Sequence, residues 1–375
     1  MTALILSCAA LAIWVGLIGF RHGFWLARER DSRDLPPEPA QWPGVVAVVP
    51  ARDEADVIAT SIASLIAQDY PGEFRIILVD DGSSDGTGAI ARALGSDRLT
   101  VMAGQALPAG WTGKLWALDQ GVRAAGEPDF LWLTDADIAH APDTLRSLVS
   151  RAEGRGLALV TLMARLHCAT WAERTLIPAF VFFFQMLYPF SAVNAPHGQG
   201  GAAGGCMLVR RSAYDAVGGV AAIRGALIDD CTFGALLKRH GPIWLGLTDR
   251  SVSIRPYRSF SSVAAMISRS AYAQLGYSPL VLVGTVLGMA LVYLVPPVMA
   301  LVGQGAARWA GLAAWALMAL AFQPMLAFYR RSPLWGLALP VIAAFYSGCT
   351  LLSAWQHHRG RGGMWKGRAQ AAMRQ

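Results

Sequence analysis

Charged residues are scarce in this sequence. They make up 15% of its 375 residues, while 54% of the residues are apolar. An ordinary soluble domain carries roughly 25% charged residues. Disordered chains are rich in charge and poor in apolar side chains, so the composition excludes a disordered protein. A mean hydropathy of +0.39 also argues against a wholly water-soluble chain.

Cysteine is sparse as well. The five cysteines are scattered along the chain without a C-x-x-C pair, at Cys8, Cys168, Cys206, Cys231 and Cys349. This spacing argues against a disulfide framework and against a cysteine zinc site. It fits a reduced domain that faces the cytosol.

Recognisable nucleic-acid-binding motifs are also missing, although the net charge is +7. Much of the positive excess lies beside long apolar runs, at Arg21, Arg28, Arg30, Arg33, Arg359, Arg361, Lys366, Arg368 and Arg374. Basic residues in such places typically set membrane topology or contact lipid headgroups. We therefore predict a membrane protein with no nucleic-acid partner.

Long uncharged runs are what the chain has in abundance. Residues 3–20 hold no charge over 18 positions, which makes about 27 Å of helix. Arg21 follows this run and no basic residue precedes it, which favours a retained anchor, with its C-terminal end in the cytoplasm, over a cleaved signal peptide. Three more runs, 279–303, 309–329 and 333–355, bring the predicted number of spans to three or four.

The basic residues near the last run leave its topology open. Arg330-Arg331 and the basic tail flank this run on opposite sides, yet the positive-inside rule assigns both to the cytoplasm. Either one run is re-entrant or one basic cluster is overruled. We also expect Pro296-Pro297 to kink or break the run that holds them. The predicted location is a bacterial-type cytoplasmic membrane, with multiple spans and the middle domain facing the cytoplasm.

A shorter apolar stretch, 176–190 (LIPAFVFFFQMLYPF), is interrupted by proline and is too short to span comfortably. Its Phe, Tyr and Met content predicts a helix lying in the membrane interface. A buried core helix is the alternative interpretation.

The middle of the chain has the pattern of an α/β domain. After a proline-rich linker, short apolar strands are predicted at 45–49, 74–79, 130–133 and 157–161, with a helix at 55–68. Alternating strands and helices indicate a mostly parallel, doubly wound sheet, which binds ligands at the carboxyl ends of its strands. The predicted organisation is an anchor at 1–24, a linker at 25–43, an α/β domain at 44–275, a membrane region at 276–356 and a basic tail at 357–375.

Two polar loops follow the first two strands. PARDEADVI (50–58) places Pro50, Arg52, Asp53 and Glu54 at the end of the first strand. In VDDGSSDGT (79–87), Asp80 and Asp81 could hold a ribose or a base edge, and Asp85 could cap a helix. Each acid alone could be a turn former or a cap. Their presence at adjacent strand ends favours a nucleotide site.

The loop TDAD (134–137) follows the third predicted strand. Asp135 and Asp137 alternate there, and two such carboxylates can bind a divalent ion that also takes phosphate oxygens, as Mg²⁺ does. This position predicts a metal site. His140 could approach the same site, but a surface histidine is the preferred interpretation.

Two further segments carry candidate phosphate and backbone contacts. In GWTGKLWALDQG (110–121), Lys114 precedes a predicted helix and could meet a diphosphate, or it could be a solvated lysine. In GGAAGGCMLVRR (200–211), Gly204 and Gly205 precede a short apolar strand and allow a ligand to approach the backbone. A plain turn remains the alternative.

An acidic pair opens the helix predicted in ALIDDCTFGALLKRHG (226–241). Asp229 or Asp230 could be the helix N-cap, or one of them could be a general base that deprotonates an acceptor hydroxyl. Arg255, Arg258 and Arg269 follow, and could meet a leaving phosphate or lipid headgroups.

The order of these motifs resembles family 2 glycosyltransferases with the GT-A fold, over about residues 45–275. The longer motifs GWTGKLWAL, FVFFFQMLYPF, AAGGCMLVRR and RGALIDD look like those of the hopene-associated glycosyltransferases. Membrane ceramide glucosyltransferases are the next most similar group. The expected fold is therefore a GT-A catalytic domain, Rossmann-like with a mostly parallel sheet, between N-terminal and C-terminal transmembrane helices.

The resemblance also implies roles for the donor-side residues. Asp53 and Asp81 would contact the base and ribose of a nucleotide-sugar. Asp135 and Asp137 would hold Mg²⁺ or Mn²⁺ against its diphosphate, with Lys114 nearby. A UDP-sugar is the favoured donor.

On the acceptor side, Asp230 would be the base of a single inverting displacement. Many membrane relatives end this domain with Q-x-x-R-W, whereas this chain reads Met266-Ile267-Ser268-Arg269-Ser270 and keeps only the arginine. We expect Tyr272 to substitute for the missing aromatic residue. Arg269 and Tyr272 are thus candidate contacts for the acceptor or the diphosphate, together with Gly204, Gly205 and Asp229.

The leading hypothesis is a membrane enzyme that transfers a sugar from a nucleotide-sugar to a lipid hydroxyl, a hopanoid-type alcohol included. A polyprenyl-phosphate glycosyltransferase is the second hypothesis, because it needs the same fold but a phosphate nucleophile. A non-catalytic nucleotide-sugar-binding membrane protein is the third. A processive polysaccharide synthase fits less well, since few membrane runs are present to form a polymer channel.

Overall fold

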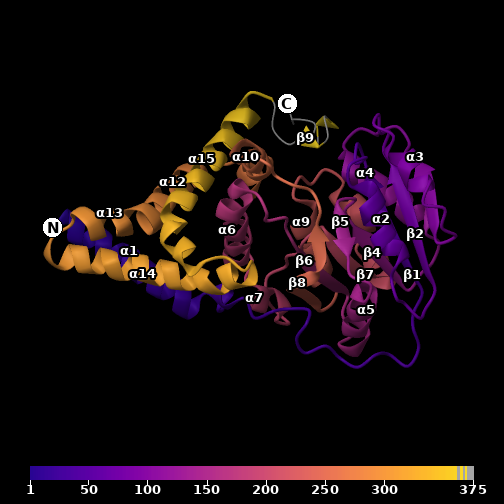
Figure 1. Cartoon of the computed structure of the whole chain (residues 1–375), viewed down its shortest axis with the longest axis horizontal. Coiled ribbons are helices and arrows are strands. Elements are labelled where there is room, and N and C mark those ends of the chain that lie inside the picture. Colours follow the sequence, from indigo (N-terminus) through magenta and orange to yellow (C-terminus); the bar gives the residue numbers. More distant parts are fainter. Residues whose placement is uncertain (361–363, 366–367, 370–375) are drawn as a thin grey trace. The chain divides into compact units, whose positions relative to one another are not determined.

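The computed structural model describes residues 1–360, 364–365 and 368–369. Within the predicted basic tail, Arg361, Lys366 and Arg374 therefore lie outside the described residues. The chain divides into two compact units (Figure 1). Among the described residues up to 360, the helical unit holds Met1–Arg28, Cys168–Ser191 and residues 256–360, and the sheet unit holds Glu29–His167 and Ala192–Arg255. Residues 168–191 and 256–275 of the predicted α/β domain thus belong to the helical unit.

An eight-stranded sheet organises the sheet unit, in the order β3-β2-β1-β4-β7-β6-β8-β5. Its strands are β1 (Val45–Ala51), β2 (Phe74–Asp80), β3 (Leu99–Ala103), β4 (Phe130–Thr134), β5 (Ile138–His140), β6 (Leu159–Arg165), β7 (Cys206–Arg210) and β8 (Ile243–Ser253). The neighbours β3-β2, β2-β1, β1-β4 and β6-β8 are parallel, and the other pairs are antiparallel. The predicted Rossmann-like, mostly parallel sheet is confirmed.

The strands that could be predicted from the sequence are the ones that are most buried. Every residue of β1 is buried, as expected for a β-branched run covered on both faces of a parallel sheet. Three strands were not predicted. β3 is only partly buried, β5 has three residues, and β8 contains the polar sequence Thr248-Asp249-Arg250 near its middle.

Helices cover the sheet (Figure 1). The main ones in the sheet unit are α2 (Ile58–Ile66), α3 (Thr87–Arg92), α4 (Gly113–Ala124), α5 (Thr144–Gly154), α8 (Arg211–Ala216) and α9 (Asp229–Lys238), with a short helical turn η2 (Gly219–Ile223). α2 is shorter than the helix predicted at 55–68. α4 lies close to β1 because Gly121 has no side chain. A Cβ atom there would lie 2.4 Å from Cγ1 of Val48.

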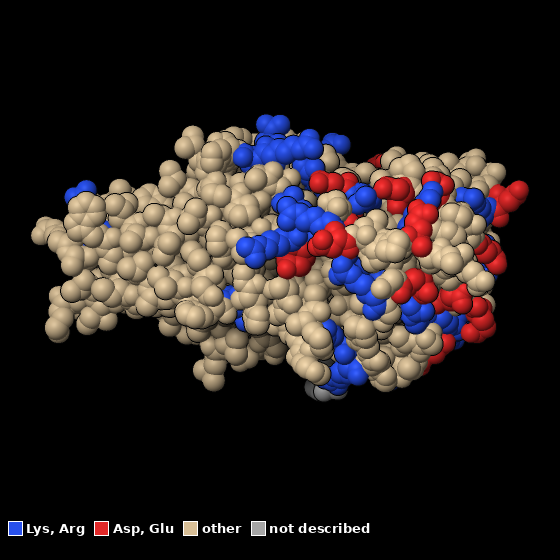
Figure 2. Space-filling view, turned by 90° about the horizontal axis from the view of Figure 1, so that it is seen from below, with Lys and Arg blue, Asp and Glu red and all other residues tan. Residues whose placement is uncertain are grey.

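Within the described residues, the helical unit contains four stretches that are long and apolar enough to cross a membrane: Thr2–Phe20, Pro279–Val302, Gly305–Phe328 and Pro333–His358. Its elements are α1 (Thr2–Phe20), η1 (Phe24–Leu26), α6 (Trp171–Leu187), α10 (Phe260–Ser268), α11 (Ala271–Gln274), α12 (Pro279–Met289), η3 (Ala290–Leu294), α13 (Val295–Val302), α14 (Gly305–Phe328), η4 (Pro333–Ala338) and α15 (Leu339–His358). A broad part of the surface in Figure 2 carries almost no Lys, Arg, Asp or Glu. A helix α7 (Phe190–Asn194) follows α6 in the chain.

The predicted distortion at Pro296-Pro297 is present as a π-helical turn, η3, directly before α13. Neither proline has a backbone N–H to give to the preceding turn. The wider turn accommodates the lost hydrogen bonds, so the helix continues through the prolines without a break.

Residues 176–187 of the apolar stretch predicted at 176–190 belong to α6, which begins earlier, at Trp171, and ends at Leu187. Thr170 and Glu173 form a capping box at its start. Phe182 and Phe183 are buried within the helical unit, and the Phe183 ring lies 4.9 Å from the Tyr346 ring. One face of this helix is therefore a packing face, and its position in a membrane interface stays a prediction.

Candidate active site

Four charged residues from three segments converge beyond the carboxyl end of β4. Lys114 Nζ lies 2.8 Å from Asp135 Oδ1 and 3.2 Å from Asp229 Oδ2. Lys114 lies inside the first turn of α4, whose N-cap is Thr112, rather than before the helix as predicted. It is thus held at a helix N-terminus between two carboxylates. Asp230 adds the fourth charge.

Asp230 is held by backbone amides. The Gly204 N–H donates to its Oδ2 at 2.9 Å, and the Cys231 N–H donates to its Oδ1 at 2.7 Å. The N-cap of α9 is Ile228, without a side-chain cap, so neither acid of the pair takes the predicted capping alternative. The Asp230 carboxylate instead ties α9 to the glycine loop before β7.

Burial sets the electrostatics of these groups. Burial, together with the nearby Asp229 charge, raises the pKa of Asp230 to about 6, against the opposing effect of Lys114. Burial alone would lower the pKa of Lys114, but the charges of Asp135 and Asp229 outweigh it and the pKa is raised. Lys114 therefore stays cationic, while Asp230 titrates close to neutral pH.

Asp137, the second acid of the TDAD loop, is paired with a different cation. Its Oδ2 lies 2.8 Å from Nε of Arg255, and Arg255 also pairs with Glu54. Burial alone would lower the pKa of Arg255, but the charges of Asp137 and Glu54 outweigh it and the pKa is raised. This pairing joins the loop after β1, the loop after β4 and the end of β8. The sequence suggested a phosphate or a headgroup as the partner of Arg255 and did not anticipate these two acids.

The donor atoms around Asp135 and Asp137 suit a hard divalent cation such as Mg²⁺ or Mn²⁺, because carboxylate oxygens are the ligands these ions prefer. Among the described residues, no group of three or more His, Cys, Asp or Glu side chains is arranged to hold a metal ion. Two carboxylates are enough where substrate phosphate oxygens complete the coordination. The residues therefore fit a metal that binds together with a phosphorylated ligand.

A pocket opens at this cluster. Its charged wall contains Lys114, Asp135, Asp229 and Asp230. The remaining lining is mostly apolar and consists of Leu115, Leu118, Leu133, Thr134, Gly204, Met207, Val220, Ile223 and Phe233. Such a pocket, apolar with a few convergent polar groups, is typical of a small-molecule site.

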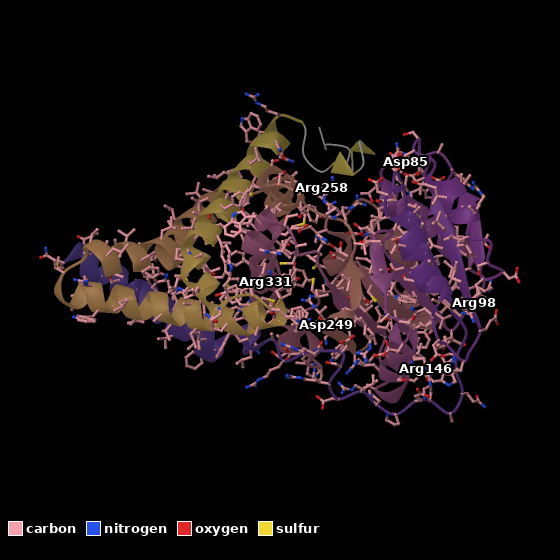
Figure 3. The ribbon with its side chains drawn as sticks, in the orientation of Figure 1. Asp85, Arg98, Arg146, Asp249, Arg258 and Arg331 are labelled. Carbon is pink, nitrogen blue, oxygen red and sulfur yellow. The ribbon has the colours of Figure 1, made fainter. Side chains whose placement is uncertain are left out.

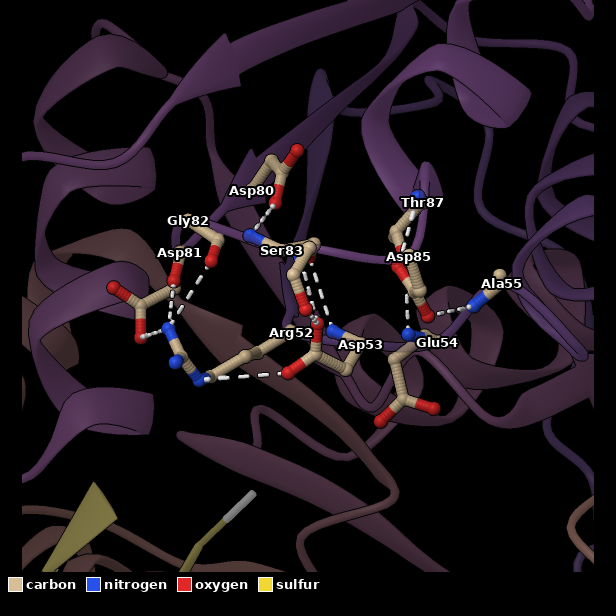
Figure 4. Close-up of polar contacts among 11 residues, drawn as sticks. Arg52, Asp53, Glu54, Ala55, Asp80, Asp81, Gly82, Ser83, Asp85 and Thr87 are labelled. Atoms are coloured by element: carbon tan, nitrogen blue, oxygen red, sulfur yellow. Dashed lines mark hydrogen bonds and ion pairs between the residues drawn. The ribbon is translucent and has the colours of Figure 1, made fainter. Parts of the chain in front are cut away.

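The two predicted nucleotide loops interlock (Figure 4). Asp53 adopts a left-handed backbone with φ of +49°, and its Oδ1 accepts the Ser84 N–H at 2.8 Å. Arg52 donates hydrogen bonds to the carbonyl oxygens of Asp81 and Gly82. The loops after β1 and β2 thus form one structure at adjacent strand ends, as the sequence pattern predicted.

The remaining residues of these loops are mainly local contacts. Asp80 accepts the Ser83 N–H at 2.9 Å, and Asp81 is buried. Asp85 (Figure 3) accepts the Thr87 N–H at 3.0 Å, but the N-cap of α3 is Gly86, so Asp85 lies one residue before the predicted capping position. Pro50 is buried inside β1 rather than at its end.

The prediction for His140 was wrong. This residue is 5% exposed and lies within hydrogen-bond distance of Thr134 and Ser251. Its ring lies 4.6 Å from that of Trp132. Burial lowers the pKa of His140 to about 3, so the imidazole is neutral. Its contacts come from Thr134 and Trp132 on β4 and from Ser251 on β8, which the sequence around His140 does not show.

Arg269 and Tyr272 lie in the helical unit. Arg269 is exposed at the C-terminal end of α10. Tyr272 is buried, and its hydroxyl donates to the carbonyl oxygen of Tyr277 at 2.8 Å. Its ring contacts those of His357 and His358. The contacts of Tyr272 are thus packing contacts within that unit, and a role for either residue toward an acceptor stays a prediction.

The comparisons with known proteins agree with this geometry. The family model described as glycosyl transferase family 2 matches residues 46–218. A protein of Bradyrhizobium elkanii named N-acetylglucosaminyltransferase is 30% identical over 140 residues, which cover 35% of this chain and 73% of that protein. The chain belongs to glycosyltransferase family 2. A Mesorhizobium japonicum protein of the same name is 30% identical over 145 residues, which span 37% of this chain and about a third of that relative's length.

Among solved structures, a mannosyltransferase from Pyrobaculum calidifontis, determined with GDP-mannose and Mn²⁺, has a TM-score of 0.60 to this family 2 chain. The match covers 94% of this chain and 99% of that one at 21% identity. It confirms the predicted GT-A fold. The narrower resemblance to hopene-associated or ceramide glycosyltransferases stays a prediction.

Proposed function

We propose that this family 2 chain is a membrane-bound inverting glycosyltransferase that moves a sugar from a nucleotide-sugar to a lipid hydroxyl. The observation that carries the proposal is the convergence of Lys114, Asp135, Asp229 and Asp230 on one pocket. A cation at a helix N-terminus suits a diphosphate. A buried carboxylate with a raised pKa suits proton abstraction.

Asp230 is the proposed general base. Two backbone amides fix its carboxylate, and its pKa of about 6 leaves it mostly ionised at neutral pH while keeping it basic enough to accept a proton. The acceptor hydroxyl gives its proton to Asp230 as its oxygen attacks the anomeric carbon. The bond from that carbon to the diphosphate breaks in the same displacement.

Lys114, Asp135 and Asp137 form the proposed leaving-group side. Asp135 and Asp137 would hold Mg²⁺ or Mn²⁺, which would neutralise the charge that develops on the departing diphosphate. Lys114 supplies a second positive charge there and is kept protonated by the acids beside it. The Pyrobaculum mannosyltransferase binds a nucleotide-sugar together with Mn²⁺, which supports a divalent ion in this chain.

The donor and acceptor are assigned by class. A UDP-sugar is the favoured donor, with Asp53 and Asp81 contacting the nucleoside and Pro50, Arg52, Glu54 and Asp80 supporting those contacts. The four apolar stretches of the helical unit support a membrane lipid as the acceptor, and the resemblance described above extends this class to hopanoid-type alcohols. The proposed location is a bacterial-type cytoplasmic membrane, with the sheet unit on the cytoplasmic side.

The Asp230→Asn variant tests the role of the base. It keeps the size of the side chain and one acceptor oxygen, but it cannot take a proton. Sugar transfer should fall by about 10²–10⁴-fold. Binding of the nucleotide-sugar, measured by calorimetry in detergent, should stay within about threefold of the wild type. Loss of donor binding together with activity would contradict a base and make Asp230 a structural residue.

A polyprenyl-phosphate glycosyltransferase is the second candidate, because it would use the same pocket. Its phosphate nucleophile is already ionised and needs no base. Full activity of Asp230→Asn on a polyprenyl phosphate would therefore favour this candidate. Metal and donor binding without turnover on any acceptor would favour a non-catalytic nucleotide-sugar-binding protein.

A further inference from the structure

A line of buried hydrogen bonds lies behind the candidate site. Thr134 Oγ1 donates to the carbonyl oxygen of Gly205 at 2.8 Å. His140 Nε2 lies 2.9 Å from Thr134 Oγ1, and His140 Nδ1 lies 2.9 Å from Ser251 Oγ. These hydrogen bonds connect four residues in the order Ser251 of β8, His140 of β5, Thr134 of β4 and Gly205, which directly precedes β7.

The direction of each hydrogen bond follows from the number of hydrogens available. The Thr134 hydroxyl has one hydrogen, and it is used on the Gly205 carbonyl, which can only accept. His140 Nε2 must therefore carry the hydrogen that it gives to Thr134. His140 Nδ1 is then the acceptor for the Ser251 hydroxyl. A single histidine tautomer satisfies all three contacts.

Thr134 lies between two segments of the candidate site. Thr134 directly precedes Asp135 and lies opposite Cys206 in the β4–β7 register. Gly205 directly follows Gly204, whose N–H holds Asp230. The hydroxyl of Thr134 thus links the segment that carries Asp135 to the segment that holds Asp230.

The other side of the glycine loop is fixed as well. Thr161 Oγ1 donates to the carbonyl oxygen of Ala203 at 3.0 Å and accepts the Ala203 N–H at 3.0 Å. Gly204 therefore lies between two anchored residues, Ala203 and Gly205. A Cβ atom at Gly204 would lie 3.4 Å from both Asp230 Oδ2 and Lys114 Nζ, so the backbone of this loop is itself part of the pocket wall.

We propose that His140, acting through Thr134, is a positioning residue that fixes the Gly204–Gly205 backbone and so sets the place of Asp230 relative to Asp135. This inference rests on the proposed function, in which Asp230 is the base. A misplacement of about 1 Å in a catalytic group can cost roughly 100-fold in rate. Thr134 lines the pocket, but its hydroxyl hydrogen is used on the Gly205 carbonyl, so its role is to position the backbone and not to take part in the reaction.

Paired variants of Thr134 test the proposal. Thr134→Val keeps the shape of the side chain and removes the hydroxyl, whereas Thr134→Ser keeps the hydroxyl. We expect kcat of Thr134→Val to fall by about tenfold or more, with KM for the donor changed by less than about threefold. Thr134→Ser should retain kcat within about threefold.

Variants of His140 separate its hydrogen bond to Thr134 from its hydrogen bond to Ser251. The amide of His140→Gln can reach Thr134 as Nε2 does, and the amide of His140→Asn replaces Nδ1 and reaches Ser251. We expect His140→Gln to keep more of the wild-type kcat than His140→Asn. Ser64→Ala is the control, because Ser64 Oγ accepts the backbone N–H of His140 at 3.0 Å but takes no part in the line. If Thr134→Val does not fold, the comparison of His140→Gln with His140→Asn tests the proposal in its place.

Amide hydrogen exchange supplies a readout that does not need turnover. In Thr134→Val, the amides of residues 203–206 and 230–231 should exchange faster than in the wild type, while Thr134→Ser should match it. Unchanged exchange, or a Thr134→Val kcat within about twofold of the wild type, would overturn the proposal. Equal loss of kcat in both Thr134 variants would also overturn it. An inactive wild type would contradict the proposed function instead, and exchange would still decide this inference.

Discussion

At the scale of single residues, two neighbouring acids of the site have different partners. Asp230 receives two backbone N–H groups, while Asp229 pairs with Lys114. Burial and the Asp229 charge both raise the pKa of Asp230, to about 6. The ionised form of Asp230 is the one that accepts a proton, so activity should rise with pH through about 6.

Replacing Asp229 tests this electrostatic coupling. Asp229→Asn removes a negative charge that raises the pKa of Asp230, so the acid limb of the pH–rate profile should move to lower pH. The profile of kcat between pH 4.5 and 8, about the range that brackets the expected pKa, is the measurement. Asp249→Asn, which changes an exposed acid (Figure 3), should leave the midpoint where it is. A midpoint that stays or rises in Asp229→Asn would contradict the assignment.

The site residues that could be predicted from the sequence are charged residues next to predicted strands or helices. Lys114, Asp135 and Asp230 were identified because they follow or precede elements of a predicted parallel sheet, which binds ligands at the carboxyl ends of its strands, although each alone could be a cap, a turn former or a solvated residue. The Arg255 pairing with Glu54 and Asp137 was missed, because these acids lie 201 and 118 positions from Arg255 and residues so far apart carry no local pattern. His140 was misplaced because its burial depends on Trp132 and Ser251, which lie on other strands.

At the scale of elements, the distance between α4 and β1 places Lys114. Gly121→Ala would put a methyl group 2.4 Å from Val48 Cγ1, which requires the helix to shift. Overpacking of this kind typically costs about 1–3 kcal/mol. We therefore expect a lower melting temperature in detergent, and a higher KM for the donor as Lys114 moves with its helix.

The double variant with Val48→Ala is the matched control for this prediction. Val48→Ala removes the atom that the new methyl group meets, so the two changes should cost less together than the sum of their separate effects. Strict additivity of the two losses in thermal stability would show that α4 and β1 are not in contact at this point.

Strands that are continuous runs of apolar residues were predicted from the sequence. Strands that form only because neighbouring strands pair with them were not. β1, β2 and β4 follow from buried runs of their own. β8 has polar residues near its middle, and it is held as a strand by β6 on one side and β5 on the other. Its identity is a property of the assembled sheet rather than of its own sequence.

At the scale of the whole molecule, contacts within the helical unit suggest a topology that would satisfy both basic clusters around the last apolar run. Trp315 Nε1 donates to the carbonyl oxygen of Leu337 at 3.2 Å, so the segment after α14 turns back to the middle of that helix. At its other end, α15 returns to the start of α12, where the His357 ring stacks on Tyr277 at 4.4 Å. We therefore infer that η4 and α15 form a re-entrant segment.

This inferred topology would place Arg331 (Figure 3) and Arg359 on the same side of the membrane, as the positive-inside rule requires. Labelling of single cysteines with a membrane-impermeant maleimide in spheroplasts is the test. Ser332→Cys, Arg359→Cys and a sheet-unit control, Arg98→Cys, should react only after permeabilisation. Gln304→Cys, in the turn between α13 and α14, should react in intact spheroplasts. Reaction of Arg359→Cys without permeabilisation would show that α15 crosses the membrane completely.

The release of nucleoside diphosphate by the purified protein in detergent tests the central claim most directly. The panel would contain UDP-, GDP- and CDP-sugars with Mg²⁺ or Mn²⁺, with and without bacterial lipid extract, for the wild type and Asp230→Asn. The account predicts release from one donor that needs both the lipid and the metal, stops with EDTA, and is lost in Asp230→Asn. Release that is independent of lipid, or a wild type that binds no nucleotide-sugar at all, would contradict it.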